Sequence, residues 1–560
     1  MKKHGVFFLL VWVLYFPGYS QQTYSELTWQ ALQAMWKAED TSGYRQALQL
    51  YETAFKTYPD SIEYLGLYKS AVLAGELRDL NKAFHYLTDL LEVGEEEPGW
   101  PTWIFITGQY AESEYENLVD DPRWKTLRQR ALAKEKEFFD RLAAAEKEFF
   151  KSKIVPVDKD QTAFVLYDQL RHNHPYIPKE QRDYSIAFPV NDSLTTSYFV
   201  HLPGSYDPDK SYPMLIFLHG AIRNNGLADY QTRSVLGDWN RYYTQYADKE
   251  EVILVFPKGS REYNWMVPDD GFFMVPEIVR QVKQAIHVDD DRVFISGHSN
   301  GATGSFSYLM KQPAQFAGFY GFNTYPKVFT GGTFVENIRN RSFINFSTDQ
   351  DYYYPPKAND QLTALMKRMG VDYEDYRYNG FPHWFPKFDA SEPAYGILYA
   401  DLINRKRDPF PRQITWEFDD EHYGSIDWIS QAKLDTLRTK ASWHQPINFS
   451  ITEWLEYNDA KDSLITKKVD RLAFDLPRKS GKILAEYDDN VFTIKTSRIS
   501  SFRINISPEM VDMGKKVQVF VNDQLLFNDL VKYDKEYLLR SFEQNRDREQ
   551  LWVNFIGIRL

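Results

Sequence analysis

Ser299 is the residue of this chain whose surroundings most clearly predict chemistry. It stands in the segment SGHSNGATG, residues 296–304, which fits the pattern G-x-S-x-G. The apolar run RVFIS precedes it and the helix-like segment ATGSFSYLMKQP follows, so the motif is predicted at a strand-to-helix turn. Small residues on either side allow a sharp turn that lifts the hydroxyl above a sheet, where it can attack a carbonyl carbon. We therefore expect Ser299 to be a nucleophile rather than part of an ordinary glycine-rich turn.

A serine hydroxyl needs a neighbouring base before it can attack, and histidine is the usual one. Serines on this kind of turn are commonly followed along the chain by an acid and then by the histidine. Of the 11 histidines, those that follow Ser299 are His383, His422 and His444. The last two fall in a β-rich C-terminal region, whereas His383 follows the predicted strand YEDYRYN on a loop with glycine and proline. We predict that His383 is the base; the alternative is a structural loop histidine.

The acid is expected between Ser299 and His383, on a loop that follows a strand. The segment SFINFSTDQDYYYPP offers Asp349 and Asp351 at such a place. Asp351 is preferred because the strand has ended by then and because a proline follows shortly after it. Asp349 remains the alternative, and the one that is not the acid is expected to cap a turn. The later aspartates lie on or beyond the next predicted helix: Asp360, Asp372 and Asp375.

Attack on a carbonyl group creates an oxyanion, which two backbone N–H groups normally stabilise. We expect these groups from Asn300, directly after the serine, and from Ala221 in the segment FLHGAIRNN. His219 and Gly220 stand beside Ala221 and are expected at the substrate; the alternative is an ordinary strand-end turn. Two further residues are expected at the substrate because they adjoin the nucleophile and the base: His298 and Trp384.

Residues 183–407 alternate between short β-rich runs and helical segments, a pattern typical of an α/β unit with a mostly parallel sheet. The runs lack polar alternation, as expected for strands that helices cover on both faces. An antiparallel hairpin, DYSIAFPV with TTSYFVHLP, is predicted on the sheet edge. The predicted core strands are MLIFL, VILVF, RVFIS, GFYGF and SFINFS.

The segments on either side of this unit have different patterns, so the expected fold class is multidomain α/β. Residues 21–153 show apolar residues at helical spacing and resemble tetratricopeptide repeats over about two repeats. This all-helical region is expected to be a scaffold, and nothing in it indicates a protein partner. Residues 154–182 are expected to be a linker. Residues 408–560 contain short runs broken by turn residues, which predict an all-β sandwich.

The composition narrows the classes of function. The chain of 560 residues contains no cysteine, which excludes disulfides, thiolate metal sites and cysteine nucleophiles. Its formal net charge is −12, so nucleic acid is not expected as a partner. Residues 1–20 combine a basic start, an apolar run and small residues before a cut, which predicts a cleaved signal peptide and a periplasmic or secreted protein. The alternative is an uncleaved membrane anchor, although the apolar run is shorter than a membrane span. No membrane-spanning segment is expected in the mature chain.

Several motifs of the α/β unit occur together in a recognisable order: LHGA, PKGSREYNW, GHSNGA, the loop DQDYYYPP and GFPHWFP. In this the chain resembles secreted α/β hydrolases of the polyhydroxybutyrate depolymerase and feruloyl esterase family, over roughly residues 184–405. The resemblance implies a triad of Ser299, Asp351 and His383, and a Trp265 that lines the acyl side of the pocket. Two features depart from the family. A glycine usual near the acid is replaced by FSTDQD, and the family's frequent cysteines are absent.

These residues together predict an exported serine hydrolase that cleaves carboxylic esters through an acyl-enzyme, without a metal or cofactor. Carbohydrate-linked esters, polyesters and small acyl esters all remain open as substrates. One alternative is a serine peptidase of the prolyl oligopeptidase type, which usually carries a β-propeller that the helical region cannot form. Another is a non-catalytic binding protein on the same fold, against which the complete candidate triad argues.

Overall fold

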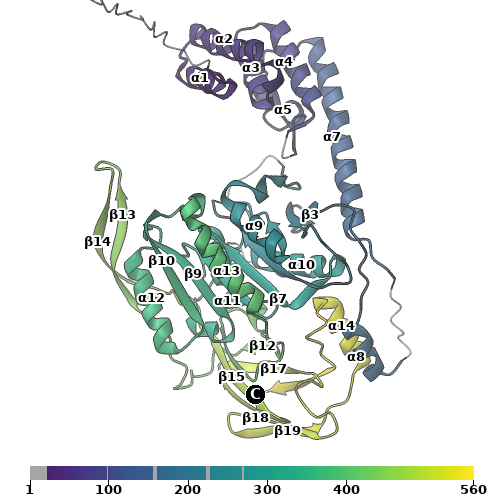
Figure 1. Ribbon diagram of the computed structural model, residues 1–560. Helices are drawn as coiled ribbons and strands as arrows, with labels where there is room; N and C mark the ends of the chain where they lie inside the picture. The colour runs from purple at the N-terminus through teal and green to yellow at the C-terminus, as the bar shows by residue number, and fades with distance from the viewer. Residues whose placement is uncertain (1–21, 97–98, 155–160, 222–226, 268–269) are drawn as a thin grey trace, which may run out of the picture. The chain divides into compact units, whose positions relative to one another are not determined.

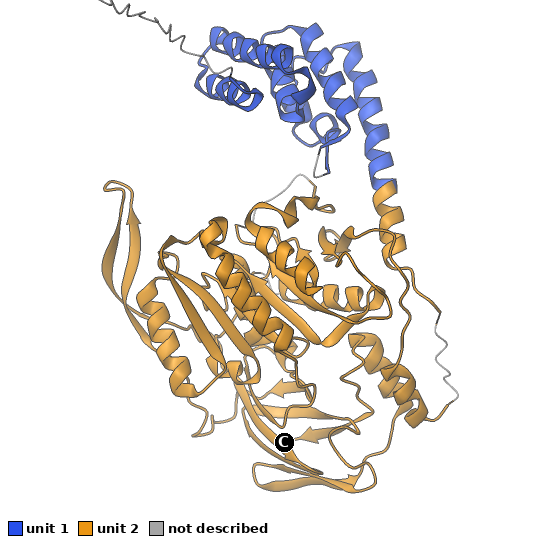
Figure 2. Ribbon diagram, in the orientation of Figure 1, with its two compact units in different colours: residues 1–140 blue, residues 141–560 orange. Residues whose placement is uncertain are grey.

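The computed structural model describes residues 22–96, 99–154, 161–221, 227–267 and 270–560. Its contacts divide the chain into two compact units, residues 1–140 and 141–560 (Figure 2). The predicted signal peptide, residues 1–20, lies outside the described part of the chain. Within that part, no helix is long and apolar enough to cross a membrane.

The first unit is built mainly from helices (Figure 1). Asp40 begins one of them, since its carboxylate accepts hydrogen bonds from the N–H groups of Ser42 and Gly43. Alanines on the predicted apolar stripes, such as Ala47 and Ala83, are fully buried where helices pack. The elements are α1 (Tyr24–Lys37), α2 (Thr41–Thr57), α3 (Tyr64–Glu76), α4 (Leu80–Val93), β1 (Glu95–Glu96), β2 (Trp100–Pro101), α5 (Ile104–Thr107), α6 (Ala111–Glu114) and α7 (Pro122–Phe149), which continues into the second unit.

An eight-stranded sheet lies at the centre of the second unit, in the order β10-β9-β8-β7-β5-β6-β4-β3 (Figure 1). The strands from β10 to β6 pair in parallel, and β3 with β4 forms the predicted antiparallel hairpin at one edge. Every apolar run predicted as a strand overlaps one of them. Their bounds are β3 (Asp183–Pro189), β4 (Thr195–His201), β5 (Tyr212–Leu218), β6 (Ile253–Pro257), β7 (Val288–Gly297), β8 (Gly318–Phe322), β9 (Ser342–Gln350) and β10 (Tyr373–Pro382).

Helices cover both faces of this sheet, because alternate side chains of a strand point to opposite faces. β5 places Met214 and Ile216 in one apolar cluster, and Leu215 and Phe217 in another. The first cluster includes side chains of α10, α11 and α12, and the second includes side chains of α9 and α13. These helices are α9 (Arg241–Glu250), α10 (Asp270–Ala285), α11 (Asn300–Lys311), α12 (Pro356–Met369) and α13 (Glu392–Asn404).

The C-terminal part of the second unit consists mostly of strands. They form a sheet in the order β11-β15-β16-β18-β19, a sheet β12-β17-β20 and a hairpin β13-β14. Their bounds are β11 (Gln413–Phe418), β12 (Ile429–Leu434), β13 (Ser450–Asn458), β14 (Ser463–Leu472), β15 (Gly481–Asp488), β16 (Val491–Ser497), β17 (Ile499–Ile506), β18 (Lys516–Val521), β19 (Gln524–Leu530) and β20 (Asn554–Arg559).

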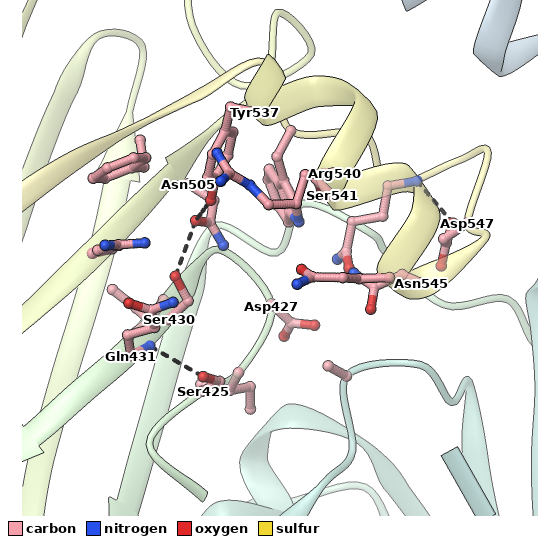
Figure 3. Close-up of a pocket in the computed structure, with 18 of the residues that line it drawn as sticks. Ser425, Asp427, Ser430, Gln431, Asn505, Tyr537, Arg540, Ser541, Asn545 and Asp547 are labelled. Carbon is pink, nitrogen blue, oxygen red and sulfur yellow. Dashed lines mark hydrogen bonds between the residues drawn. The ribbon is translucent and has the colours of Figure 1, made fainter. Parts of the chain in front are cut away.

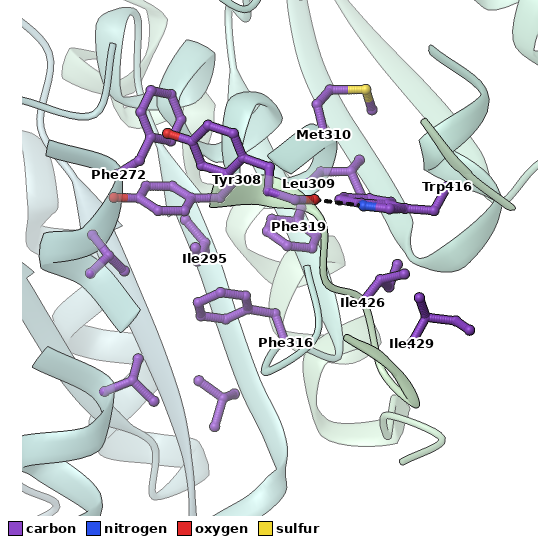
Figure 4. Packing of buried hydrophobic residues seen from close by; sticks show 14 of the residues in the cluster. Phe272, Ile295, Tyr308, Leu309, Met310, Phe316, Phe319, Trp416, Ile426 and Ile429 are labelled. Atoms are coloured by element: carbon purple, nitrogen blue, oxygen red, sulfur yellow. Dashed lines mark hydrogen bonds between the residues drawn. The ribbon is translucent and has the colours of Figure 1, made fainter. Parts of the chain in front are cut away.

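One apolar core runs from the eight-stranded sheet into the C-terminal strands. Tyr308 and Phe316 belong to the same cluster as Trp416 and Ile426 (Figure 4). The indole N–H of Trp416 donates to the backbone oxygen of Tyr423 at 2.8 Å, which satisfies its polar atom inside this core. Since the core is shared, the boundary predicted at residues 407 and 408 lies inside a single compact unit.

The segment expected to be a linker, residues 154–182, contains a helix, α8 (Ala163–Arg171). The Thr162 hydroxyl caps it by accepting a hydrogen bond from the N–H of Val165. Its Leu166 and Leu170 share a buried cluster with Leu538 of α14 (Lys535–Asn545). So short a helix is stable because it packs on a partner far along the chain, which its own sequence does not reveal.

A cluster of buried charges joins the eight-stranded sheet to the segment after α14. Arg407 Nη1 lies 2.8 Å from Asp547 Oδ2, and Arg548 Nε lies 2.8 Å from Asp290 Oδ2. Lys283 Nζ lies 3.1 Å from Asp290 and 3.5 Å from Asp547. Burial by itself raises the pKa of the Asp547 carboxyl, but Arg407 and Lys283 outweigh it and hold that pKa well below its usual range. Each of these two carboxylates therefore has two cationic partners.

Candidate active site

Ser299 lies at the turn between β7 and α11, as its sequence context predicts. Its backbone has φ 57° and ψ −120°, a conformation that residues other than glycine rarely adopt. The N–H of Ser299 donates to the backbone oxygen of Phe322 in β8 at 3.0 Å, which helps to hold the turn. Such strain costs about 1–3 kcal/mol and is concentrated at functional sites.

The two glycines of the motif leave no room for side chains. A Cβ at Gly297 would lie 2.3 Å from the carbonyl carbon of Gly301, and a Cβ at Gly301 would lie 1.7 Å from the backbone oxygen of Leu218. Because both obstacles are backbone atoms, no side-chain movement could relieve the clash. The close approach of β5, the turn and α11 therefore requires the G-x-S-x-G spacing.

A chain of contacts links Ser299 to His383 and Asp351. His383 Nε2 lies 2.8 Å from Ser299 Oγ, and His383 Nδ1 lies 3.0 Å from Asp351 Oδ1. The second contact is short but is not aligned as a hydrogen bond, a geometry that often tightens only when substrate binds. His383 directly follows β10 and Asp351 directly follows β9. These strands are parallel neighbours, so their carboxyl ends bring both residues to one edge of the sheet.

Asp349, the alternative acid, has other partners. Its Oδ1 accepts hydrogen bonds from the N–H groups of Gly380 at 2.8 Å and Phe381 at 3.3 Å. Both N–H groups lie where the pairing of β10 with β9 is irregular, between Tyr378 and Pro382. Asp349 thus satisfies backbone donors that the strand ladder does not pair.

The backbone oxygen of His383 receives two side-chain hydrogen bonds, from His298 Nε2 at 2.8 Å and from Asn323 Nδ2 at 2.6 Å. Burial and the neighbouring His383 lower the pKa of His298 to about 3, so His298 is neutral and carries its proton on the donating nitrogen. The two donors fix the backbone that carries the candidate base. Asn323 was not among the residues predicted at the site; its place directly after the strand GFYGF was the available signal.

The loop after β5 carries His219 and Ala221. His219 Nε2 accepts a hydrogen bond from the N–H of Gly259 at 3.0 Å, which leaves the proton on Nδ1, 2.8 Å from the oxygen of Gly220. Burial lowers the pKa of His219, which keeps the ring neutral. Ala221 has φ 45°, a second unusual backbone conformation at this site. It lines the same cavity as Asn300, the first residue of α11, where backbone N–H groups have no partner within the helix.

Two cavities meet at Ser299. The larger has a volume of about 590 Å³ and the smaller of about 260 Å³. The residues that line both are Ser299, Asn300, Tyr353 and His383. The larger is also lined by four residues expected at the substrate: His219, Gly220, His298 and Trp384. Lining residues that were not predicted from the sequence include Trp239 in the larger cavity and Trp454 and Arg471 in the smaller.

Trp265 lines neither of these cavities, contrary to the expectation from the family resemblance. Its side chain is fully buried and packs so closely on Gly304 that a Cβ there would lie 2.4 Å from the indole ring. The ring meets His219 edge to face, with centroids 4.7 Å apart. Trp265 therefore supports His219 from within the core and does not reach a substrate.

A third cavity, of about 540 Å³, contrasts with these two (Figure 3). Its wall is polar: Ser430 and Tyr537 both donate to Asn505 Oδ1, at 3.0 and 2.7 Å. The described residues that line it include serines but no histidine, so none of those serines has a histidine base there. In the part of the chain that the structure describes, no group of three His, Asp or Glu side chains is placed to hold a metal ion.

A mostly parallel sheet covered on both faces, with a serine at a strained strand-to-helix turn and a histidine after a neighbouring strand, is the arrangement of α/β hydrolases. Residues 195–326, which include Ser299, match the model of the Esterase family, described as "Putative esterase". The chain is accordingly a carboxylic-ester hydrolase. In the comparison with curated proteins, no sequence matched it.

Similar solved structures each cover 40% of this chain. A thermostable esterase is 20% identical with a TM-score of 0.34, and 64% of its own length is covered. The S-formylglutathione hydrolase of Staphylococcus aureus is 15% identical with a TM-score of 0.31 over 100% of its length. Esterase 2 of Thermogutta terrifontis is 14% identical with a TM-score of 0.33 over 96% of its length. Likenesses this loose do not transfer an activity from those proteins to this chain.

Proposed function

We propose that this protein is an exported serine esterase in which Ser299 is the nucleophile, His383 the general base and Asp351 the acid that orients it. The observation that carries the proposal is the pair of contacts from His383, 2.8 Å to Ser299 Oγ and 3.0 Å to Asp351 Oδ1. The strained backbone of Ser299 supports it, because such conformations are concentrated at functional sites.

The reaction would proceed in two acyl transfers. His383 Nε2 takes the proton of Ser299 as Oγ attacks the ester carbonyl carbon, and then gives that proton to the leaving alcohol. A water molecule, deprotonated by His383, attacks the acyl-enzyme and releases the carboxylic acid. Asp351 stays ionised throughout, orienting the imidazole and stabilising its charged form.

Each tetrahedral intermediate carries an oxyanion that needs preorganised donors. The backbone N–H groups of Ala221 and Asn300 are the proposed pair, since both residues line the cavity at Ser299. Removing one such donor from a site of this kind typically costs about 3 kcal/mol of transition-state stabilisation. The two cavities on either side of Ser299 suit the two arms of an ester. Aromatic walls in the larger, such as Trp239 and Tyr395, favour an apolar arm there.

The proposal extends to the flanking parts of the chain. Residues 1–20 have the composition of a cleaved signal peptide, and export would be tested by cell fractionation and by the mass of the mature chain. The first unit would be a scaffold of helical repeats, as the alanine stripes suggest, and the C-terminal sheets would form a sandwich with no residue of the triad. Carbohydrate-linked esters, polyesters and small acyl esters are all candidate substrates.

The deciding experiment is hydrolysis of 4-nitrophenyl acetate and butyrate by the mature protein and by its Ser299→Ala variant. We expect the variant to lose roughly a thousandfold or more in kcat, because no other hydroxyl lies at His383 Nε2 in the described structure. Ser305→Ala is the matched control, because Ser305 lies on the same helix but donates to the backbone oxygen of Ile295. Equal activity of wild type and Ser299→Ala would refute the proposal.

A further inference from the structure

The smaller cavity at Ser299 has a wall from a distant part of the chain. Trp454 of β13 and Arg471 of β14 line it together with Ser299 and His383. β13 packs against α12, and the hairpin stands next to this helix in Figure 1. A segment of the C-terminal part therefore contributes side chains to the site of the reaction.

The hairpin is held by the loop that carries Asp351. Ile451, at the base of β13, is buried in a cluster with Tyr354 of that loop and Ala358 of α12. The rings of Tyr354 and Trp454 meet edge to face, with centroids 6.1 Å apart. On the same loop, Tyr353 lies with its ring centroid 4.3 Å from that of His383. The position of the hairpin and the position of the candidate base are thus set by one loop.

Arg471 is held in place by stacking rather than by an ion pair. Its guanidinium carbon lies 3.5 Å from the ring centroid of Trp454. No hydrogen bond or ion pair links its guanidinium to any residue that the structure describes. Two nearby cations are held by ion pairs instead, Lys467 by Glu456 and Lys327 by Asp475. Stacking leaves the in-plane N–H groups of a guanidinium free to bind an acceptor.

The rest of the cavity wall combines aromatic rings with neutral polar side chains such as Thr303 and Asn323. Tyr353 is 54% exposed and Phe329 is 45% exposed, so the core does not account for either ring. Of the described residues that line this cavity, Arg471 alone carries a permanent charge. One cation among exposed rings matches an organic group with one negative charge, because a guanidinium binds a carboxylate through two parallel hydrogen bonds.

We propose that Arg471 binds a carboxylate on one arm of the ester, so that this hydrolase selects esters with a negative charge in the smaller cavity. The inference rests on the proposed function, since it assigns the surroundings of an ester bound at Ser299. Arg471 is a specificity residue in this proposal and takes no part in the chemical step. A dianionic phosphate is a poorer match, because the cavity offers it a single cation.

The test compares kcat/KM for charged and neutral esters in wild type and in Arg471→Gln. Charge on the acyl arm is probed by 4-nitrophenyl hydrogen adipate against 4-nitrophenyl hexanoate. Charge on the alcohol arm is probed by 4-acetoxybenzoate against 4-acetoxybenzamide. In one of the two pairs we expect Arg471→Gln to lose about tenfold or more on the charged ester and to stay within about twofold on the neutral one.

The matched control is Lys468→Gln, which removes a cation from the same strand that lines neither cavity at Ser299. It should leave both members of each pair unchanged. The inference is overturned if Arg471→Gln leaves all four esters unchanged, or lowers the charged and neutral members of each pair equally. Equal loss would mean that Arg471 supports the cavity wall without recognising charge.

A binding measurement separates this inference from the proposed function. Benzoate and benzamide are titrated by calorimetry into Ser299→Ala and into Ser299→Ala with Arg471→Gln. We expect the double variant to bind benzoate at least about fivefold more weakly and benzamide equally well. If benzoate binding depends on Arg471 but wild type hydrolyses no ester, the proposed esterase function is refuted and the proposed carboxylate site at Arg471 stands. Ser299-dependent hydrolysis with no charge effect of Arg471 in either assay would keep the esterase and refute the anion site.

Discussion

The charges around Lys283 and the candidate triad around Ser299 lie in the same compact unit. Lys283 and its two carboxylate partners are buried, as are Asp351 and His383, whereas Ser299 is partly exposed. At Lys283, the carboxylates of Asp290 and Asp547 each meet two cations within the protein. At Ser299, one carboxylate contacts one histidine, and the hydroxyl opens onto a cavity. The charges of the first cluster face opposite charges within the protein, whereas the second leaves the hydroxyl of Ser299 available to react.

Burial of polar groups is therefore not by itself the mark of a functional site in this molecule. Buried charges that are fully paired hold segments together, and their loss is expected to appear as lost stability. A buried group that is partly paired, strained and exposed to a cavity is expected to appear in activity.

Asp351→Asn should lower kcat by about 10³- to 10⁴-fold, because an amide cannot stabilise the charged imidazole and can hold the ring in the wrong tautomer. Its urea midpoint should stay close to that of wild type, since Asp351 Oδ1 also accepts the N–H of Tyr353 and an amide oxygen can do the same. Kinetics with 4-nitrophenyl butyrate and unfolding curves followed by tryptophan fluorescence measure both. A kcat within tenfold of wild type would show that Asp351 is not the acid.

Asp547→Ala should lower the stability of the protein and leave its activity unchanged. Removing this carboxylate leaves Arg407 and Lys283 buried with too few partners, which typically costs about 3–5 kcal/mol of unfolding free energy. Activity per folded molecule should be unchanged, because Asp547 lines neither cavity at Ser299. The control is Asp389→Ala, which removes an exposed partner of Arg241 and should not move the urea midpoint measurably. Equal midpoints for the two variants would contradict the role given to the charge cluster.

Stability should also fall on mild acidification, through His287 beside the charge cluster. Burial and then Arg548 lower the pKa of His287 to about 4, below its unfolded value of 6.5. Between these two pH values the unfolded chain binds a proton at His287 that the folded protein does not bind. The contribution of neutral His287 to the free energy of unfolding is therefore complete above about pH 6.5 and is lost as the pH falls towards 4. The melting temperature should therefore drop between pH 7.5 and 5, and drop less in His287→Asn. An identical drop in both proteins would rule out His287 as a source.

Asp349→Asn should have the smallest effect. Asp349 accepts hydrogen bonds from the N–H groups of Gly380 and Phe381, and an asparagine oxygen can accept the same two. We expect kcat within about threefold of wild type and an unfolding midpoint only slightly lower, because bonds to a charged acceptor are somewhat stronger. If Asp349→Asn loses more activity than Asp351→Asn, the assignment of the acid must be exchanged.

Much of the α/β unit could be predicted because local patterns decide it. Continuous apolar runs such as GFYGF, which became β8 residue for residue, show strands that are covered on both faces. The turn at Ser299 could be located because a strand, a G-x-S-x-G motif and a helix follow one another without interruption. The family resemblance was less reliable for single residues, since Trp265 supports His219 in the core instead of lining a cavity at Ser299.

Local sequence patterns were enough to predict the strands of the α/β unit, the turn at Ser299, the absence of disulfides and a short list of bases and acids. Tertiary structure decided which of these come together: Asp351 lies 3.0 Å from His383, whereas Asp349 caps the irregular end of β10. It also brought Arg471 to the cavity at Ser299 and packed α8 on α14. Patterns of hydrophobicity and turn residues depend on residues that are close in sequence, so they predict the secondary structure of each segment. Contacts between distant segments depend on how their surfaces fit, which no single segment encodes.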